Sequence, residues 1–373
     1  MTSKPTNAPA NTLASQRVRK KTDPKMVNLA LQGGGAHGAF TWGVLDKLLE
    51  DGRLGFEGIS GTSAGAMNAV ALADGWYEQG ADGAREKLET FWRAISRNGS
   101  FSVTDQQQEV LDRFLSFWMW PMNNGASAEA FAKLFPLAPW ANPFTSQLTS
   151  PYDVNPLNIN PLRDVVERLV DFDRVAKCND FKLFIAATQV HSGKIRLFRR
   201  DDVTADAVLA SACLPYAFQA VEVDGEPFWD GGFTGNPALY PFFTETQCED
   251  IVLIQINPVE REETPKTAQE ILERVSEITF NASLLREFRA IDFVNRLIDD
   301  GKLEGGEYRR NRVHRIDASE ELAAMGAGSK FNTSWTLFEE LRDVGRAAAA
   351  EFLKAHYTDI GVRGTLDLRA AFS

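Results

Sequence analysis

The sequence predicts an α/β protein with a mainly parallel central sheet. Residues 26–31 (MVNLAL) and 56–60 (FEGIS) are short strand-like runs, and each leads through a glycine-rich turn into a helical pattern. A strand, a tight turn and a helix in this order form the repeating unit of a parallel sheet, because the helix carries the chain back to the start of the next strand. A chain of 373 residues is long enough to bury a substantial core around such a sheet.

The overall composition excludes one class of partner. The chain has a net charge of −11, with 44% hydrophobic and 24% charged residues, as in an ordinary globular protein. Nucleic-acid binding requires clustered positive charge, so no nucleic-acid partner is expected.

The three cysteines, Cys178, Cys213 and Cys248, are far apart and form no CxxC pair, which is typical of reduced core residues. We expect neither a metal site nor a cofactor.

The first 25 residues differ from the rest of the chain. They are rich in Thr, Asn, Ser and Pro, and their six basic residues outnumber the single acidic residue, Asp23. This composition predicts a disordered basic tail, with a tether to an anionic membrane or a targeting segment as alternatives. A secretory signal is not predicted, because this segment lacks an apolar stretch of about 7–15 residues. A transmembrane helix is not predicted either, because prolines and a glycine interrupt the longest uncharged runs of the chain. The expected location is cytoplasmic, either in solution or at the surface of a membrane or lipid granule.

The amino-terminal part of the chain alternates between strands and helices. A helix is predicted from Gly38 onward, since apolar residues recur at helical spacing at Phe40, Val44, Leu45 and Leu48. After the second strand, we expect a helix of small residues at 64–73 that ends at Asp74-Gly75. The next helix is marked by Leu88, Phe91, Trp92 and Ile95.

An aromatic-rich helical insertion is predicted at about 105–152. Eight aromatic residues are interleaved with prolines there: Phe114, Phe117, Trp118, Trp120, Phe131, Phe135, Trp140 and Phe144. Such a segment can form a lid or a wall that binds acyl chains, or it can be a packed subdomain, and both alternatives stay open.

The second half of the chain continues the α/β pattern. A helix is expected after the N-cap Asn160, and capping boxes at Thr267/Glu270 and Thr336/Glu339 predict two more helices. The first of these two carries apolar residues on one face, at Ile271, Leu272, Val275, Ile278, Ala282 and Leu285. Further strands are expected at 181–190, 194–198, 251–256 and 313–316, and a short helix at 206–212.

Residues 61–65 (GTSAG) place a serine between two glycines, Gly61 and Gly65, directly after the second strand. This pattern is typical of the nucleophile elbow, a sharp strand-to-helix turn that exposes a serine hydroxyl. Ser63 is therefore the candidate nucleophile of a serine acyl hydrolase. The alternative is a tight glycine turn with a solvated serine.

The glycine cluster 33–38 (GGGAHG) admits two interpretations. Gly33, Gly35 and Gly38 also fit a dinucleotide-binding fingerprint, but that site needs an acidic residue at the end of the second strand, and Glu57 lies at its beginning. A Walker loop would need a lysine after the last glycine, where this chain has alanine. We favour an oxyanion hole, in which backbone N–H groups uncovered by side chains bind the negative oxygen of a tetrahedral intermediate.

A serine nucleophile needs a base. A Ser-Asp-His order would require His314 or His356, and both lie in a charged or helical context without a turn signature. Asp230 is a stronger candidate, because it begins the only DGG sequence of the chain, with Gly231 and Gly232, and follows aromatic residues. An aspartate at a partly buried strand end can have a raised pKa and accept a proton. An ordinary Asp-Gly hairpin turn is the alternative.

Taken together, these motifs resemble those of the patatin-like phospholipases. The shared motifs stand in the same order and spacing over roughly 27–258: the cluster 33–38, the elbow 61–65, the stretch 211–215 (SACLP), and Asp230-Gly231-Gly232 followed by Asn236-Pro237. The resemblance implies a three-layer α/β/α fold and a Ser-Asp dyad with Ser63 as nucleophile and Asp230 as general base. It also implies an oxyanion hole formed by the backbone of Gly33, Gly34 and Gly35.

The same resemblance implies a substrate class. Members of the family cleave fatty acyl esters of phospholipids, lysophospholipids or neutral lipids, generally without calcium. The chain departs from the family at His37, where an arginine or lysine is usual. A fixed positive charge near a substrate phosphate is then lost or becomes dependent on pH.

The expected organisation is a tail at 1–25 and one acyl hydrolase domain at 26–373, with a C-terminal helical extension at 265–373. Two alternatives to a lipid hydrolase stay open. One is a non-catalytic protein of the same fold that binds a lipid surface or granule. The other uses the same site for acyl transfer or for hydrolysis of a polyester.

Overall fold

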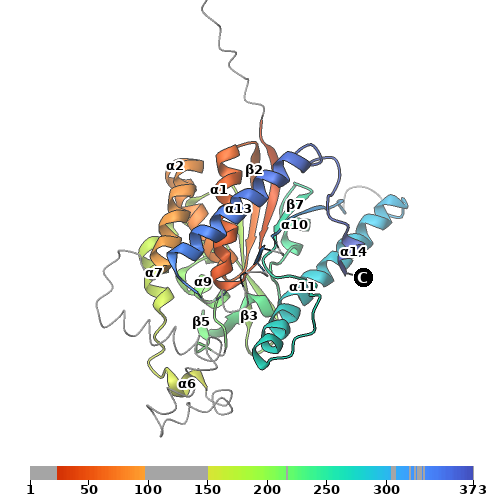
Figure 1. The fold of residues 1–373 in the computed structure, drawn as a ribbon. Helices are drawn as coiled ribbons and strands as arrows, with labels where there is room; N and C mark the ends of the chain where they lie inside the picture. Colours follow the sequence, from red (N-terminus) through yellow and green to blue (C-terminus); the bar gives the residue numbers. More distant parts are fainter. Residues whose placement is uncertain are drawn as a thin grey trace, which may run out of the picture.

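We describe a computed structural model of residues 23–96, 150–215, 217–303, 308–318, 321–322, 325, 330 and 332–372. An eight-stranded sheet forms its centre, in the order β5-β6-β3-β2-β1-β7-β8, with β4 paired to β3. The strands are β1 (Lys25–Leu31), β2 (Leu54–Gly61), β3 (Lys182–Gln189), β4 (Ile195–Arg199), β5 (Val221–Val223), β6 (Glu226–Asp230), β7 (Asp250–Ile254) and β8 (Arg312–Ile316). Helices cover both faces of this sheet, so the predicted α/β/α layering is confirmed (Figure 1).

The middle of the sheet is parallel. β1 lies between β2 and β7, and β2–β3 and β7–β8 are also parallel pairs, whereas β4 and β6 run antiparallel to β3. The central strands are buried on both sides, which explains why β1 and β7 appear in the sequence as continuous apolar runs. Because β1 and β2 are parallel neighbours, the two glycine motifs that follow them lie at the same end of the sheet.

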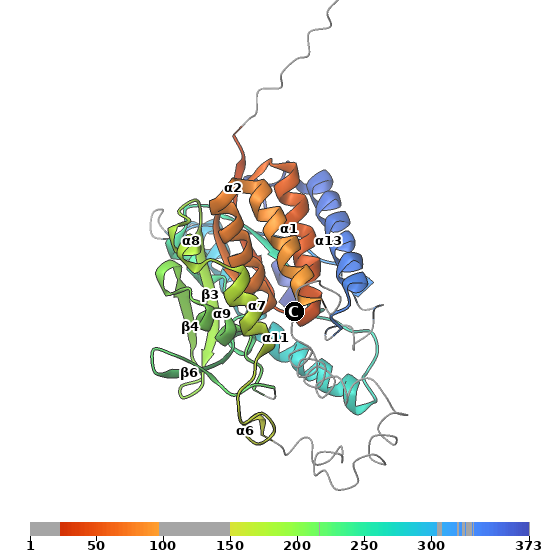
Figure 2. The same ribbon diagram turned by 90° about the vertical axis from the view of Figure 1, so that its left-hand side faces the viewer.

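One face of the sheet carries the larger core. It is covered by α1 (Gly38–Asp51), α2 (Ala64–Ile95), α7 (Pro161–Leu169), α8 (Phe172–Lys177), α9 (Ala205–Ser211) and α13 (Trp335–His356). In Figure 2, α2, α1 and α13 lie side by side. The backbones of α1 and α13 touch at Gly43 and Gly345, since a Cβ at either glycine would collide with a carbonyl of the other helix. The C-terminal segment is therefore part of this layer.

The opposite face has a smaller core. It is covered by α10 (Tyr240–Glu245), α11 (Ala268–Asp299) and α14 (Leu368–Phe372). The capping box of Thr267 and Glu270 is formed at the start of α11, as predicted. The apolar residues named from the sequence do not all lie on the buried face of this helix, however. Its buried residues are Glu277, Asn281, Leu284, Phe288 and Ile291, whereas Ile271, Val275 and Ile278 are 45–54% exposed.

Two helix boundaries also differ from the prediction. Asp74-Gly75 does not end a helix, because the Asp74 carboxylate is buried against the Lys87 ammonium at 2.8 Å and α2 continues to Ile95. The break falls instead near Gly80, whose φ of +61° lies in the left-handed region that glycine tolerates. Similarly, α13 begins after the N-cap Ser334, two residues before the predicted N-cap Thr336.

Several predictions concern residues that lie partly or wholly outside the described ranges. The insertion at about 105–152 is described only from residue 150, where the short α6 (Pro151–Val154) begins, and the tail 1–25 only from residue 23.

Among the described residues, no helix has the length and apolar character needed to cross a bilayer. The three cysteines are free thiols, and Cys178 and Cys213 are buried. The hairpin of β5 and β6 was not predicted, although β6 carries Asp230.

Candidate active site

The serine elbow is a strained turn between β2 and α2. Ser63 has φ 54° and ψ −122°, a conformation that L-residues rarely adopt. Its backbone N–H donates to the Ser211 hydroxyl at 2.9 Å, which holds the turn from the side of α9. A Cβ at Gly61 would lie 2.6 Å from the Gly65 carbonyl oxygen, and one at Gly65 would collide with the Leu31 backbone. Both glycines are therefore required for the elbow to pack closely against β1.

The glycine cluster lies directly against this elbow. A Cβ at Gly33 would stand 2.7 Å from the Ser63 Cβ, and a Cβ at Gly38 would stand 2.6 Å from the Ala64 Cβ. Gly35 has φ +60° and begins the 3-10 helix η1 (Gly35–His37), which leads into α1. Two motifs that are about 30 residues apart in the sequence thus form one surface.

Side-chain amides hold part of the glycine backbone. The Gly33 N–H donates to Asn236 Oδ1 at 2.7 Å, and Asn257 Nδ2 donates to the Gly33 carbonyl at 2.7 Å. By contrast, the N–H groups of Gly34 and Gly35 make no hydrogen bond to any residue that the structure describes. Of the three predicted oxyanion-hole glycines, Gly33 already uses its N–H in the hydrogen bond to Asn236, whereas the N–H groups of Gly34 and Gly35 can donate to a ligand.

Asp230 reaches the elbow from the other side of β2. It ends β6 and pairs with Ala187 of β3, which is the strand next to β2. A Cβ at the following Gly231 would lie 3.0 Å from the Thr62 methyl group, and the Thr62 hydroxyl donates to the Gly235 carbonyl at 2.7 Å. The residue before Ser63 is thus fixed to the loop that follows Asp230.

The environment of Asp230 favours proton uptake near neutral pH. Its side chain is fully buried, and this burial raises the pKa to about 7, although the Gly232 N–H and the Ser63 hydroxyl act in the opposite direction. Oδ1 accepts the Gly232 N–H at 2.7 Å. Oδ2 has no hydrogen-bond partner within the described part of the chain, so it stays open to accept a proton.

His314 and His356, the two histidines that a Ser-Asp-His order would require, lie away from this site. His314 lies on β8, which β1 and β7 separate from β2, and its ring bonds Asp250 and Thr365. His356 bonds Asp359 near the end of α13. His37 does lie in the glycine cluster, but burial and the nearby Lys330 charge lower its pKa to about 3. It is therefore uncharged at neutral pH, and the positive charge usual at this position is absent from the loop.

The competing dinucleotide site lacks its acidic residue. The Glu57 carboxylate accepts the N–H groups of Gln247 and Cys248, both at 2.6 Å, and so has a structural role in the middle of β2. Within the described ranges, no group of three or more potential ligand side chains is arranged to hold a metal ion.

Some residues of this site were not found from the sequence. Four buried or half-buried side chains surround the elbow and the glycine cluster: Gln32, Ser211, Asn257 and Lys330. A usable signal existed for Gln32 and Asn257, because they are polar residues that follow the largely apolar strands β1 and β7, which pair with each other. Ser211 begins the SACLP stretch that the sequence shares with the patatin-like phospholipases, although no role was predicted for it, and Lys330 carries no such signal.

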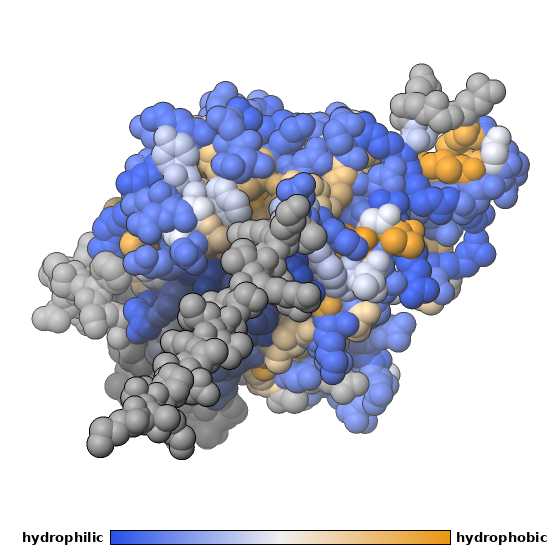
Figure 3. All heavy atoms as spheres, turned by 90° about the horizontal axis from the view of Figure 1, so that it is seen from above, coloured by the Kyte–Doolittle hydropathy of each residue, from blue (hydrophilic) through white to orange (hydrophobic). Residues whose placement is uncertain are grey.

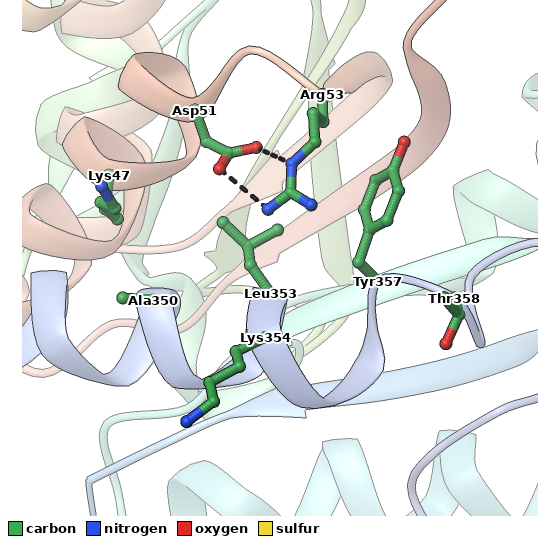
Figure 4. Close-up of a pocket in the computed structure, with 8 residues that line it drawn as sticks. All are labelled: Lys47, Asp51, Arg53, Ala350, Leu353, Lys354, Tyr357 and Thr358. Carbon is green, nitrogen blue, oxygen red and sulfur yellow. Dashed lines mark hydrogen bonds and ion pairs between the residues drawn. The ribbon is translucent and has the colours of Figure 1, made fainter.

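A surface cavity of about 380 Å³ lies elsewhere, between the ends of α1 and α13 (Figure 4). Its lining includes Arg53, which immediately precedes β2, whereas Ser63 follows the other end of that strand. The Arg53 guanidinium is paired with Asp51 and lies over the Tyr357 ring. This cavity is therefore separate from the candidate site.

Comparisons with known proteins identify the family of the chain. The family model of the patatin-like phospholipases matches residues 29–243. No curated protein matches the chain significantly. Among solved structures, VipD from Legionella pneumophila is similar at 16% identity and a TM-score of 0.42, with 89% of this chain and 67% of that chain covered. ExoU, in complex with SpcU from Pseudomonas aeruginosa, is similar at 16% identity and a TM-score of 0.29, with 89% and 52% covered.

Proposed function

Because the chain belongs to the patatin-like phospholipase family, we propose that it is a lipid acyl hydrolase that uses a Ser63–Asp230 dyad. The observation that carries this proposal is the convergence of three distant motifs. The glycine cluster, the strained serine elbow and the buried Asp230 meet at the ends of three adjacent strands, β1, β2 and β3 with its partner β6. Nucleophile, base and oxyanion donors are the parts that acyl transfer to serine requires.

The proposed reaction has two steps. Asp230 takes the Ser63 hydroxyl proton as the oxygen attacks the acyl carbonyl, and the Gly34 and Gly35 N–H groups bind the resulting oxyanion. Collapse of the tetrahedral intermediate breaks the ester bond, and the leaving alcohol takes the proton from Asp230. In the second step Asp230 removes a proton from water, which attacks the acyl-enzyme. The bond between the acyl group and the Ser63 oxygen then breaks, Asp230 returns the proton to that oxygen, and the fatty acid is released.

A lipid surface is the proposed setting for this chemistry. The exposed residues Ile271, Val275 and Ile278 form an apolar stripe on one side of α11, and Phe280 of the same helix packs against Gly232. This half of α11 lies at the bottom of Figure 1, the end at which β1 and β2 terminate. The opposite end, seen from above in Figure 3, is mostly hydrophilic. An apolar stripe at this end of the molecule supports the proposed contact with a lipid surface.

Covalent labelling of Ser63 tests the proposal. The wild-type protein is expected to hydrolyse fatty acyl esters and to form a fluorophosphonate adduct at Ser63, and Ser63→Ala should lose both properties while remaining folded. Ser60→Ala is the matched control, because Ser60 is a fully buried serine of the preceding strand β2 whose hydroxyl has no described partner. Full activity of Ser63→Ala would refute the mechanism.

The same assay separates the alternatives. A lipid-surface or granule-binding protein without catalysis would form no adduct at Ser63. An acyltransferase would form the adduct and then give an acylated alcohol rather than a free fatty acid when glycerol is supplied. Activity across a chain-length series of esters, beside a phospholipid, a lysophospholipid and a polyester, would define the substrate.

A further inference from the structure

Asn257 holds one peptide group of the glycine cluster from a single side. Its Nδ2 donates to the Gly33 carbonyl at 2.7 Å, and its side chain is almost fully buried. In a trans peptide the N–H of the next residue points opposite to the carbonyl. The Gly34 N–H therefore points away from Asn257, and it donates to no residue that the structure describes.

The orientation of the Asn257 amide is itself fixed. The Lys330 ammonium donates to Asn257 Oδ1 at 3.0 Å, and an ammonium can only donate, so Oδ1 has to face Lys330 and Nδ2 has to face Gly33. The backbone of Asn257 is anchored as well, because its N–H donates to Gln32 Oε1 at 2.7 Å. Lys330 in turn faces the buried Glu277 carboxylate at 3.4 Å.

Neighbouring packing leaves this peptide little freedom. A Cβ at Gly34 would stand 2.6 Å from the Ile256 side chain, and one at Gly35 would stand 2.7 Å from the Lys330 carbonyl oxygen. The glycine cluster is thus in contact with residues 256–257 after β7 and with Lys330, all of which lie outside the segment that the family model matches.

We propose that Asn257 is a positioning residue, which aims the Gly34 N–H at the oxygen of the tetrahedral intermediate, and that Lys330 fixes the Asn257 amide for this purpose. The inference rests on the proposed function, since it assumes an oxyanion bound by the glycine cluster. Preorganised donors stabilise a transition state because no rearrangement is needed when charge develops.

The main test is Asn257→Asp, which keeps the shape of the side chain and its acceptor for Lys330 but cannot donate to Gly33. The assay uses a soluble short-chain nitrophenyl ester, with sites counted by fluorophosphonate titration. Removing an oxyanion donor costs about 10²–10³-fold in kcat, so a misdirected donor should cost about 10–100-fold. KM should change by less than about threefold, and the rate of Ser63 phosphonylation should fall with kcat.

A matched control separates positioning from stability. Asn28 is also a fully buried asparagine whose Nδ2 donates to a backbone carbonyl, that of Cys248 at 2.9 Å, but it lies in β1 away from the glycine cluster. Asn28→Asp is expected to lower the yield of folded protein and to leave kcat per titrated site unchanged. An equal fall in kcat per site for the two variants would overturn the inference.

A second pair of variants keeps the test decisive if Asn257→Asp does not fold. Lys330→Met frees the Asn257 amide to rotate and should lower kcat about 3–10-fold, whereas Lys330→Arg should restore it. If Asn257→Asp folds and keeps kcat within about twofold of wild type, the positioning role is overturned and the proposed function is left intact. If only the Lys330 variants fold, the same result with Lys330→Met has the same meaning. A wild-type protein that neither hydrolyses esters nor labels at Ser63 would overturn both.

Discussion

Two buried aspartates at opposite ends of the sheet have opposite protonation behaviour. Asp230, beside the serine elbow, has a pKa raised to about 7 by burial. A single backbone N–H, that of Gly232, lies within hydrogen-bond distance of its carboxylate and acts to lower this pKa. Asp250, at the start of β7, is also nearly fully buried. Burial alone would raise its pKa, but hydrogen bonds from His314, Arg312 and the Gly361 N–H hold it well below the usual range.

The difference shows that burial by itself does not decide the role of a carboxylate. A buried carboxylate surrounded by cations and N–H donors is stabilised as an ion and links the strands that it touches. A buried carboxylate with one backbone donor and an open oxygen is poised to exchange a proton. We therefore expect the Asp250 region to govern stability and the Asp230 region to govern chemistry.

The largest expected effect comes from neutralising each carboxylate in turn. Asp230→Asn should reduce kcat/KM by about 10³-fold or more, because the base is lost, with the fold retained. Asp250→Asn should instead reduce the free energy of unfolding by about 3 kcal/mol, because it leaves Arg312 without its buried partner. Its kcat per titrated site should stay within about twofold of wild type. Denaturant unfolding and ester hydrolysis, measured on both variants, check that one variant loses activity and the other loses stability. The expectation is contradicted if Asp250→Asn loses catalysis while Asp230→Asn retains it.

The pH dependence should separate the two aspartates in the same way. Asp230 must be ionised to act as a base, so kcat/KM should rise through about pH 7 and then level off. Since its pKa is raised by folding, Asp230 favours the folded state below pH 4 and loses that contribution as the pH rises through 7. The pKa of Asp250 is lowered, so its contribution is present above about pH 4 and disappears as the pH falls further. An activity profile that is flat between pH 5 and 9 would contradict the role of Asp230.

A smaller effect is expected from the apolar stripe beside the Asp230 region. Introducing charge with Val275→Asp and Ile278→Asp should lower hydrolysis of phospholipid vesicles about 5–10-fold and leave hydrolysis of a soluble short-chain ester within twofold. Phe293→Asp is the matched control, because Phe293 is equally exposed on α11 but lies roughly 20–30 Å further along the helix. A similar loss in the control would show that general charge, and not this stripe, is responsible.

The sequence by itself determined the parallel sheet and the order of its motifs. The apolar runs of β1, β2 and β7 and the glycines after the first two strands are local features, and local features specify strands, turns and capping boxes such as Thr267/Glu270. The same reasoning located Ser63 and Asp230 as candidates. The Asp-Gly pattern alone did not distinguish Asp230 from Asp74, since both residues precede a glycine in the sequence. Burial does not distinguish them either, because both side chains are fully buried in the structure.

Only the tertiary structure decided what surrounds each of these residues. Lys87 pairs with Asp74, whereas no cation contacts Asp230 among the described residues. The buried face of α11 follows from its position on the sheet, which places Asn281 and Leu284 inward and leaves Ile278 exposed. Likewise, Asn236 and Asn257 form hydrogen bonds with the backbone of Gly33, whereas neither bonds the N–H of Gly34. Such contacts join residues up to about 300 positions apart in the chain, as with Gly35 and Lys330, and no local pattern encodes them.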